Sequence, residues 1–126
     1  MDASHPLELR SLFELDDDQF RQRFRKTPLW RPKRRGILRN AAIALGNQPA
    51  KENIEPLLLG THDQEPLIRG AVVWALLQHL NAIDDMPTAI NTQIRDRLRQ
   101  LEQTETDLQV RTELDAIPDS PTNRFL

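Results

Sequence analysis

Apolar residues recur along most of the chain at intervals of three and four, the spacing of one face of an α-helix. The pattern predicts helices at about residues 6–15, 17–25, 32–45, 53–59, 66–80, 87–102 and 107–117. The helix at 66–80 is apolar almost all round, so it should be the most deeply buried. Since β-branched and aromatic residues are sparse, the sequence predicts an all-α protein of six or seven helices.

Capping residues mark where several of these helices begin and end. The acidic run at 16–18 supplies an N-cap and first-turn carboxylates for the helix at 17–25. Gly46 and Asn47 follow residue 45 and give a signal for a helix C-cap. Further N-caps are expected at Asp63, at Asp85, and at Thr106 or Asp107.

A short motif recurs with an arginine at the same place in each copy. "ILRNAAIAL" (37–45) resembles "LIRGAVVWAL" (67–76), and "LQVRTELDAI" (108–117) is a weaker third copy. Short helix pairs with such a repeat are typical of α-solenoids of the HEAT class. The sequence therefore predicts a HEAT-like helical repeat domain. The matched arginines are Arg39, Arg69 and Arg111.

Length and composition limit the class of protein further. A chain of 126 residues fits one domain, expected at 1–117, with 118–126 as a flexible tail. The sequence contains no run of 18 apolar residues that could span a membrane, and residues 1–10 do not resemble a secretory signal. The chain has no cysteine, which excludes disulfides, iron–sulfur clusters and thiolate zinc sites within it. These features favour a cytoplasmic protein.

The distribution of charge is strongly uneven, although the formal net charge is only −2. Residues 19–51 contain ten of the 17 Lys and Arg residues and no Asp or Glu, so this window carries +10 and the remainder −12. We call residues 19–51 the basic segment. Such a separation favours a surface that faces a polyanion, although a merely solvated charged face is the alternative.

The chemistry of the basic segment favours RNA phosphate as its ligand. Arginine predominates in it, and the planar guanidinium matches a phosphate with two hydrogen bonds. No reading helix or dimer motif for the DNA major groove is recognisable, so structured RNA is the better candidate. Trp30 either stacks on a base or covers the core, and Arg39 either binds phosphate or supports the repeat. The candidate phosphate ligands are Arg21, Arg25, Lys26, Arg31, Lys33, Arg34, Arg35 and Arg39.

No catalytic constellation is apparent in the sequence. His5, His62 and His79 occur in unrelated contexts, where a histidine is usually a surface or capping residue. The acidic triplet at 16–18 and the acidic pair at 84–85 lie where helix caps belong, which favours capping over metal binding. Trp74 lies among apolar residues and is expected in the core. The predicted catalytic and metal sites are therefore none.

Three segments carry a resemblance to a known family. They are "DDDQFRQRFRKTPLWRPKRRGILRNAAIALGN" (16–47), "EPLIRGAVVWAL" (65–76) and "TETDLQVRTELDAI" (104–117). In order and approximate spacing they resemble the C-terminal part of bacterial tRNA epoxyqueuosine reductase, and the resemblance extends from about Leu7 to Ile117. It implies a HEAT-like region that helps to grip the anticodon stem-loop of tRNA.

The resemblance also implies chemistry that this chain cannot perform alone. Enzymes of that family reduce the epoxide of epoxyqueuosine at the tRNA wobble position, the last step of queuosine synthesis. They use a cobalamin and two 4Fe–4S clusters, which are held by their N-terminal parts. With no cysteine and no counterpart of those parts, this chain is expected to bind none of these cofactors and to be non-catalytic on its own.

Several accounts of the chain stay open at the level of sequence. It is a piece of a longer reductase, a subunit separated from its catalytic half, or a free-standing relative. A HEAT-repeat protein–protein adaptor is the main alternative function, since that is the commonest use of such repeats. An enzyme related to phycobilin lyases, which also have short HEAT-like repeats, is a third, but no chromophore-handling residues are recognisable.

Overall fold

The computed structural model describes residues 6–24 and 33–118, and the side chains of residues 9–24 and 34–118. Within these ranges it contains seven α-helices, one 3₁₀ helix and no strand, which confirms the all-α prediction. The predicted tail, residues 118–126, lies outside the described residues except for Pro118. The elements are α1 (Pro6–Leu12), α2 (Asp17–Phe24), α3 (Lys33–Asn47), η1 (Lys51–Asn53), α4 (Ile54–Gly60), α5 (Pro66–Ala82), α6 (Thr88–Thr104) and α7 (Leu108–Leu114).

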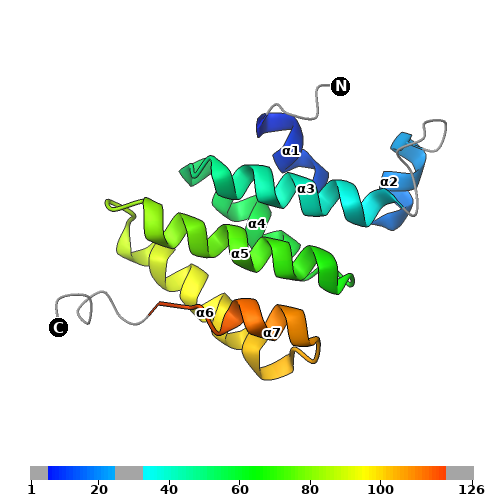
Figure 1. The fold of residues 1–126 in the computed structure, drawn as a ribbon. Coiled ribbons are helices and arrows are strands. Elements are labelled where there is room, and N and C mark those ends of the chain that lie inside the picture. Colours follow the sequence, from blue (N-terminus) through cyan, green and yellow to red (C-terminus); the bar gives the residue numbers. More distant parts are fainter. Residues whose placement is uncertain (1–5, 25–32, 119–126) are drawn as a thin grey trace.

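Helices α3, α5 and α7 lie side by side and run in the same direction, while α4 and α6 return behind them (Figure 1). Helix α5 occupies the centre, because it packs against α3, α4, α6 and α7. Helix α1 covers α3 and α4. The apolar composition of α5 on all sides follows from this central place, as the sequence predicted.

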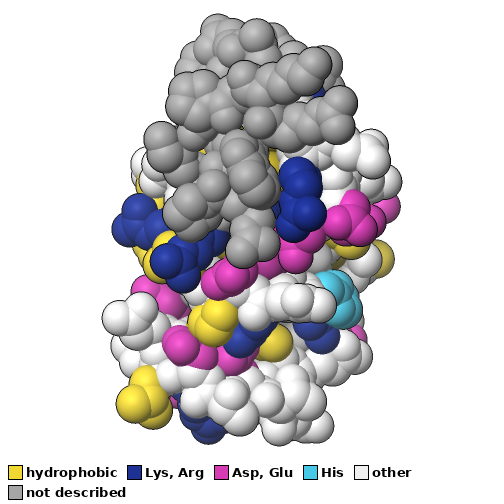
Figure 2. Space-filling view, turned by 90° about the vertical axis from the view of Figure 1, so that its right-hand side faces the viewer, with side chains coloured by type: hydrophobic (Ala, Val, Ile, Leu, Met, Phe, Trp, Pro, Cys, Tyr) yellow, Lys and Arg dark blue, Asp and Glu magenta, His cyan; other side chains and the backbone are white. Residues whose placement is uncertain are grey.

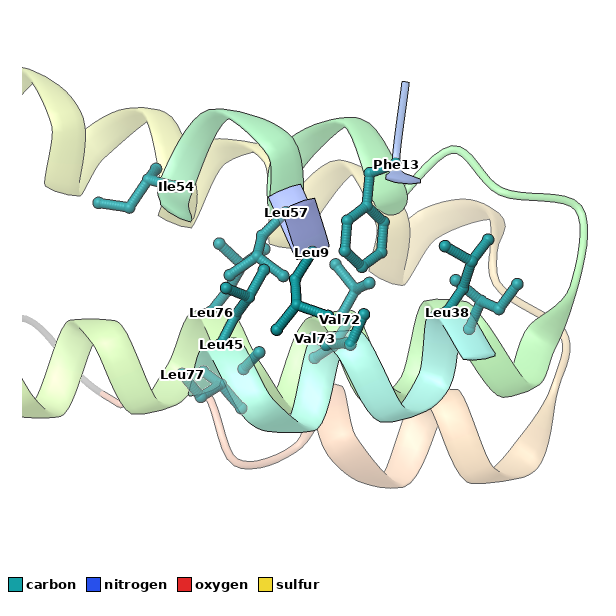
Figure 3. Close-up of a cluster of buried hydrophobic side chains, with 14 of the residues drawn as sticks. Leu9, Phe13, Leu38, Leu45, Ile54, Leu57, Val72, Val73, Leu76 and Leu77 are labelled. Atoms are coloured by element: carbon teal, nitrogen blue, oxygen red, sulfur yellow. The ribbon is translucent and has the colours of Figure 1, made fainter. Parts of the chain in front are cut away.

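The core is filled mainly by aliphatic side chains from α3, α4, α5 and α6. Leu38, Leu57, Val72 and Leu76 are fully buried, and Figure 3 shows them with the other side chains that converge between the helices. Phe13, directly after α1, points into the same cluster. At one end of α3 a smaller aromatic contact forms, where the rings of Phe20 and Phe24 on α2 lie 4.6 Å apart.

The caps confirm some sequence predictions and correct others. Asp16 begins α2 with a capping box, since its carboxylate accepts from Gln19 N at 2.7 Å and Gln19 Oε1 accepts from Asp16 N. Asp107 caps α7 by accepting from the backbone nitrogens of Gln109 and Val110, as predicted. The predicted cap at Asp85 is wrong, because Pro87 precedes α6 and Asp85 instead lies 3.9 Å from Lys51.

Two further cap predictions fail for local reasons. Asp63 accepts from the backbone nitrogen of Glu65 in the turn before α5, and Glu65 is the residue at the N-cap. Gly46 and Asn47 belong to α3, which ends at Asn47 rather than at residue 45. Gly46 therefore does not terminate the helix, and its small size serves another purpose.

A buried polar network ties α1, α3, η1 and α5 together around Asn53, which is 1% exposed. Its amide nitrogen donates to Leu45 O and Gln48 O and lies 3.3 Å from His79 Nε2, while its oxygen accepts from Arg10 at 3.0 Å. His79 Nδ1 lies 2.8 Å from Ala75 O. Since a carbonyl only accepts, Nδ1 carries a hydrogen, and in the neutral imidazole Nε2 accepts from Asn53.

Acidification should weaken the fold through His79. Burial lowers the pKa of His79 below its usual value, against hydrogen bonds to backbone that raise it. The unfolded chain therefore binds a proton as the pH falls below about 6.5 while the folded chain does not, and the free energy of unfolding declines there, by at most about 1.4 kcal/mol per pH unit. Urea denaturation between pH 8 and 5 measures this decline.

A His79→Leu variant is the control for that titration. It should be less stable than the parent at pH 8, because Asn53 and Ala75 lose a hydrogen-bond partner. Its stability should then fall less steeply between pH 7 and 5. Equal slopes in the two proteins would contradict the assignment to His79.

Candidate nucleic-acid interface

Two of the three repeat arginines hold the turns that precede their own helices. Arg69 donates to the carbonyl oxygens of Asp63 and Gln64 at 2.9 and 3.0 Å. Arg111 donates in the same way to the carbonyl oxygens of Glu102 and Glu105. The repeat seen in the sequence therefore corresponds to a structural device that organises two successive turns.

Arg69 also connects one repeat to the next. Its Nε and Nη2 atoms each lie 2.8 Å from a carboxylate oxygen of Glu105, whose side chain is only 1% exposed. The hydrogen bond from Arg69 lowers the pKa of Glu105, against the effect of burial, and the same pair raises the pKa of Arg69. Both groups are thus held in their charged forms.

Arg39 occupies the matching position on α3 but has no such partners among the described residues. Its side chain is exposed, and its hydrogen bond is to the side chain of the adjacent Asn40. The residues that correspond to Asp63 and Gln64, six and five before the arginine, are Lys33 and Arg34, which already belong to α3. Of the two roles that the sequence left open for Arg39, its exposure favours the binding of a ligand.

Arg34, a predicted phosphate ligand, is engaged within the protein. Its Nη2 lies 2.7 Å from Asp63 Oδ2 and its Nε lies 3.2 Å from Asp17 Oδ1. Its guanidinium also covers the ring of Phe20, with 6.0 Å from Cζ to the centroid. The side chain of Arg34 is only 12% exposed, and its contacts join α2, α3 and the turn before α5.

The other described cations of the basic segment are on the surface. Arg35 is 58% exposed and lies 4.0 Å from Glu65. Arg21 and Arg23 are exposed on α2, where Arg23 lies over the ring of Phe24. Figure 2 shows Lys and Arg side chains beside the undescribed segment and Asp and Glu side chains gathered beneath them. The positive surface therefore has an acidic margin.

Part of the predicted site lies outside the described residues. Arg25, Lys26, Trp30 and Arg31 fall in residues 25–32, and Lys33 begins α3 with a side chain that is not described. The proposed roles of these residues stay predictions. Arg21, Arg34, Arg35 and Arg39 are the predicted residues whose places are known, and they lie on α2 and α3.

Sequence reasoning missed the acids that neutralise part of the basic segment. Asp17, Asp63 and Glu65 each lie within 4.0 Å of Arg34 or Arg35. The repeat carried the signal needed to find two of them. Since repeat helices stack in parallel, the turn before one copy meets the start of its neighbour, which places "THDQEP" beside "KRR".

Other classes of site receive no support from the described part of the chain. His, Asp and Glu residues there form no group of three that could hold a metal ion. His62 is exposed, and burial together with nearby Arg97 lowers its pKa. None of the helices within residues 6–24 and 33–118 is long and apolar enough to cross a membrane.

In its described residues this is an all-α protein with several exposed cations on α2 and α3. Over 72 residues, 56% of the chain, it is 39% identical to an epoxyqueuosine reductase from Xanthomonas campestris pv. campestris. The match spans about a fifth (20%) of that protein's length, so it indicates a relation and leaves the whole protein's activity open. No family model and no solved structure matches the chain.

Proposed function

We propose that this chain is a tRNA-binding helical domain that grips the anticodon stem-loop during queuosine modification in the cytoplasm. The observation that carries the proposal is the charge of +10, uninterrupted by any acid, over residues 19–51. The partial identity to an epoxyqueuosine reductase supports the pathway. The reductase chemistry then belongs to a separate catalytic subunit or to a part outside this sequence.

The arrangement of helices supports a HEAT-like assignment. Successive helices α3, α5 and α7 run in parallel, with α4 and α6 returning between them, as stacked helix pairs do (Figure 1). The ion pair of Arg69 with Glu105 links two consecutive turns of this stack. Stacked repeats present an extended surface, which suits a grip on a nucleic acid.

The proposed contacts are with the RNA backbone. Arg35 and Arg39 are the exposed cations of α3 whose side chains are described, and they lie one helical turn apart. Together with Arg21 and the predicted ligands at 25–33 they neutralise phosphates without reading sequence. Arg34 contributes by fixing the helices that carry them.

The cofactors of epoxyqueuosine reductases are not assigned to this chain. A 4Fe–4S cluster is held by cysteine thiolates, and the chain has no cysteine. The residues present therefore do not fit such a cluster.

Binding of a tRNA with a wobble guanosine should depend steeply on salt. If about five phosphates are neutralised, the slope of log K against log salt concentration is near −4, or roughly 250-fold between 50 and 200 mM KCl. Replacing both Arg35 and Arg39 by glutamine should make the slope shallower by about 2 units. Fluorescence anisotropy of labelled tRNA at four salt concentrations measures both effects.

Arg99→Gln is the matched control, because Arg99 is an exposed arginine on α6, outside the basic segment. It should retain the parent's slope to within about half a unit. Undetectable binding at 50 mM KCl, or binding that salt does not change, would contradict the proposed function. Equal losses in the double variant and in Arg99→Gln would contradict its location.

A further inference from the structure

A groove of about 500 Å³ lies where α3, α5 and α7 meet, and Arg39 is the residue of the basic segment that lines it as a cation. Ile43, Leu67 and Trp74 supply much of its apolar lining. Arg39, Gln109 and Glu113 supply a cation, an amide and a carboxylate from two flanking helices. The volume falls within the range of sites for small organic groups.

The aromatic side chain that lines the groove, Trp74, is held in place by its packing against α3. Trp74 was expected in the core, and it does pack against the core, but its ring is only partly covered and also lines the groove. Gly46 of α3 presses closely on this ring, since a Cβ built there would lie 2.5 Å from Trp74 Cζ3. A fixed and partly open indole is a suitable surface for stacking a flat ligand.

The cation at the groove is available for a ligand. Arg69 and Arg111, its counterparts in the repeat, are occupied by turn carbonyls and by Glu105. Arg39 has no carboxylate within ion-pair distance among the described residues, and only the neighbouring Asn40 accepts from it. One wall of the groove thus offers an exposed guanidinium beside an indole.

We propose that this groove receives one unstacked nucleobase of single-stranded RNA, with Trp74 as its stacking partner and Arg39 on the adjoining phosphate. Gln109 and Glu113 offer an amide and a carboxylate to the base edge, where a carboxylate accepts from an exocyclic amino group. Aromatic stacking combined with phosphate contact is the usual mode for single-stranded RNA. The proposal rests on the proposed RNA-binding function and adds to it a base-dependent contact.

The test uses the fluorescence of Trp74. The chain has two tryptophans, so a Trp30→Phe variant leaves Trp74 as the sole reporter. A seven-nucleotide RNA is titrated into it beside the same oligomer lacking its bases, and anisotropy of labelled tRNA is recorded in parallel. The base-bearing oligomer should quench Trp74 and bind roughly 5- to 150-fold more tightly than the abasic one, as one stacked base predicts.

A groove-filling variant locates the effect. Gly70 lines the groove, and a Cβ added there would meet only Val110 Cγ2, at 3.8 Å. The position therefore has room for a Cβ, and the further carbons of Gly70→Leu should fill the groove and abolish the difference between the two oligomers, with folding checked by thermal melting. Ala89→Leu, an exposed site on α6, is the matched control and should keep that difference.

The outcomes separate this inference from the proposed function. Salt-dependent binding of tRNA with equal affinity for both oligomers, or quenching that survives Gly70→Leu, overturns the base site and leaves the proposed function standing. If the parent chain binds no RNA at all, both the base site and the proposed function are overturned. If an apolar peptide segment of a protein occupied the groove instead, Gly70→Leu would leave both oligomer affinities unchanged, which again overturns the base site.

Discussion

Replacing Glu105 by alanine is expected to lower the free energy of unfolding by about 3–5 kcal/mol, because one partner of a buried ion pair is removed. Glu105 is 1% exposed at the side chain and holds Arg69 with two hydrogen bonds of 2.8 Å. Its carboxylate also accepts from the backbone nitrogen of Asp107, which helps to shape the turn before α7. Urea denaturation followed by circular dichroism measures the loss.

The matched control is Glu102→Ala, three residues earlier in α6 and exposed. Only its backbone oxygen accepts from Arg111, so the substitution should change stability by no more than about 0.5 kcal/mol. Similar losses for the two variants would show that removal of a carboxylate, rather than the buried pair, is responsible.

A double-mutant cycle examines the pair itself. Arg69→Met with Glu105→Leu replaces both charges by apolar side chains of similar size, a change that often costs little. The double variant should therefore lose less stability than the sum of the two single variants, with a coupling of about 1–3 kcal/mol. Strict additivity would contradict a direct interaction.

The same pair predicts the acid limit of the fold. Since the pKa of Glu105 is lowered in the folded state, the stabilisation is fully present above the unfolded pKa of about 4.5. This stabilisation is lost as the pH falls below that value, because the carboxylate of Glu105 then binds a proton in the unfolded chain but not in the folded chain. The parent should lose this contribution on acidification, while Glu105→Ala should not.

The helices were predictable because their apolar periodicity is local information. Helices at 17–24, 54–60, 66–82 and 108–114 lie close to their predicted positions, and Asp16 and Asp107 cap as expected. The repeated arginine motif also carried structural information, since two of its members hold equivalent turns. Local pattern and tertiary packing agree at these positions, which is typical of a foldable sequence.

The candidate site was less predictable because its partners come from distant segments. Sequence grouped Arg34 with the phosphate ligands, but Asp63, 29 residues away, pairs with it. Trp74 was expected only in the core, and the groove beside it needs Gln109 and Glu113 from α7. A single sequence shows which residues are charged or aromatic, but the approach of helices decides which of them meet.

Gly46 shows the same limit at one residue, and it gives the second large expected effect. The sequence suggested a C-cap there, yet Gly46 lies inside α3 against α5. A Cβ at this position would lie 2.5 Å from Trp74 Cζ3, 3.0 Å from Ala75 Cα and 3.1 Å from Ala75 Cβ. The contact with Trp74 is too short unless the indole moves, and the contact with the backbone of Ala75 is relieved only if the two helices separate slightly.

Gly46→Ala should therefore lower the free energy of unfolding by about 1–3 kcal/mol, the usual cost of overpacking, despite the better helix propensity of alanine. Gly36→Ala is the same change in the same helix, where nothing lies within 4 Å of the added Cβ. It should raise stability by about 0.5–1 kcal/mol. Thermal melts of both variants measure this difference in sign.

The consequence for the groove follows from the same contact. Gly46 allows α3 to approach α5 closely enough to support the Trp74 ring, so an added methyl group should displace that ring. In a Trp30→Phe background, Gly46→Ala should shift the emission of Trp74, whereas Gly36→Ala should leave it unchanged. If both glycine variants gained stability and kept the parent's emission, the close contact between α3 and α5 would be contradicted.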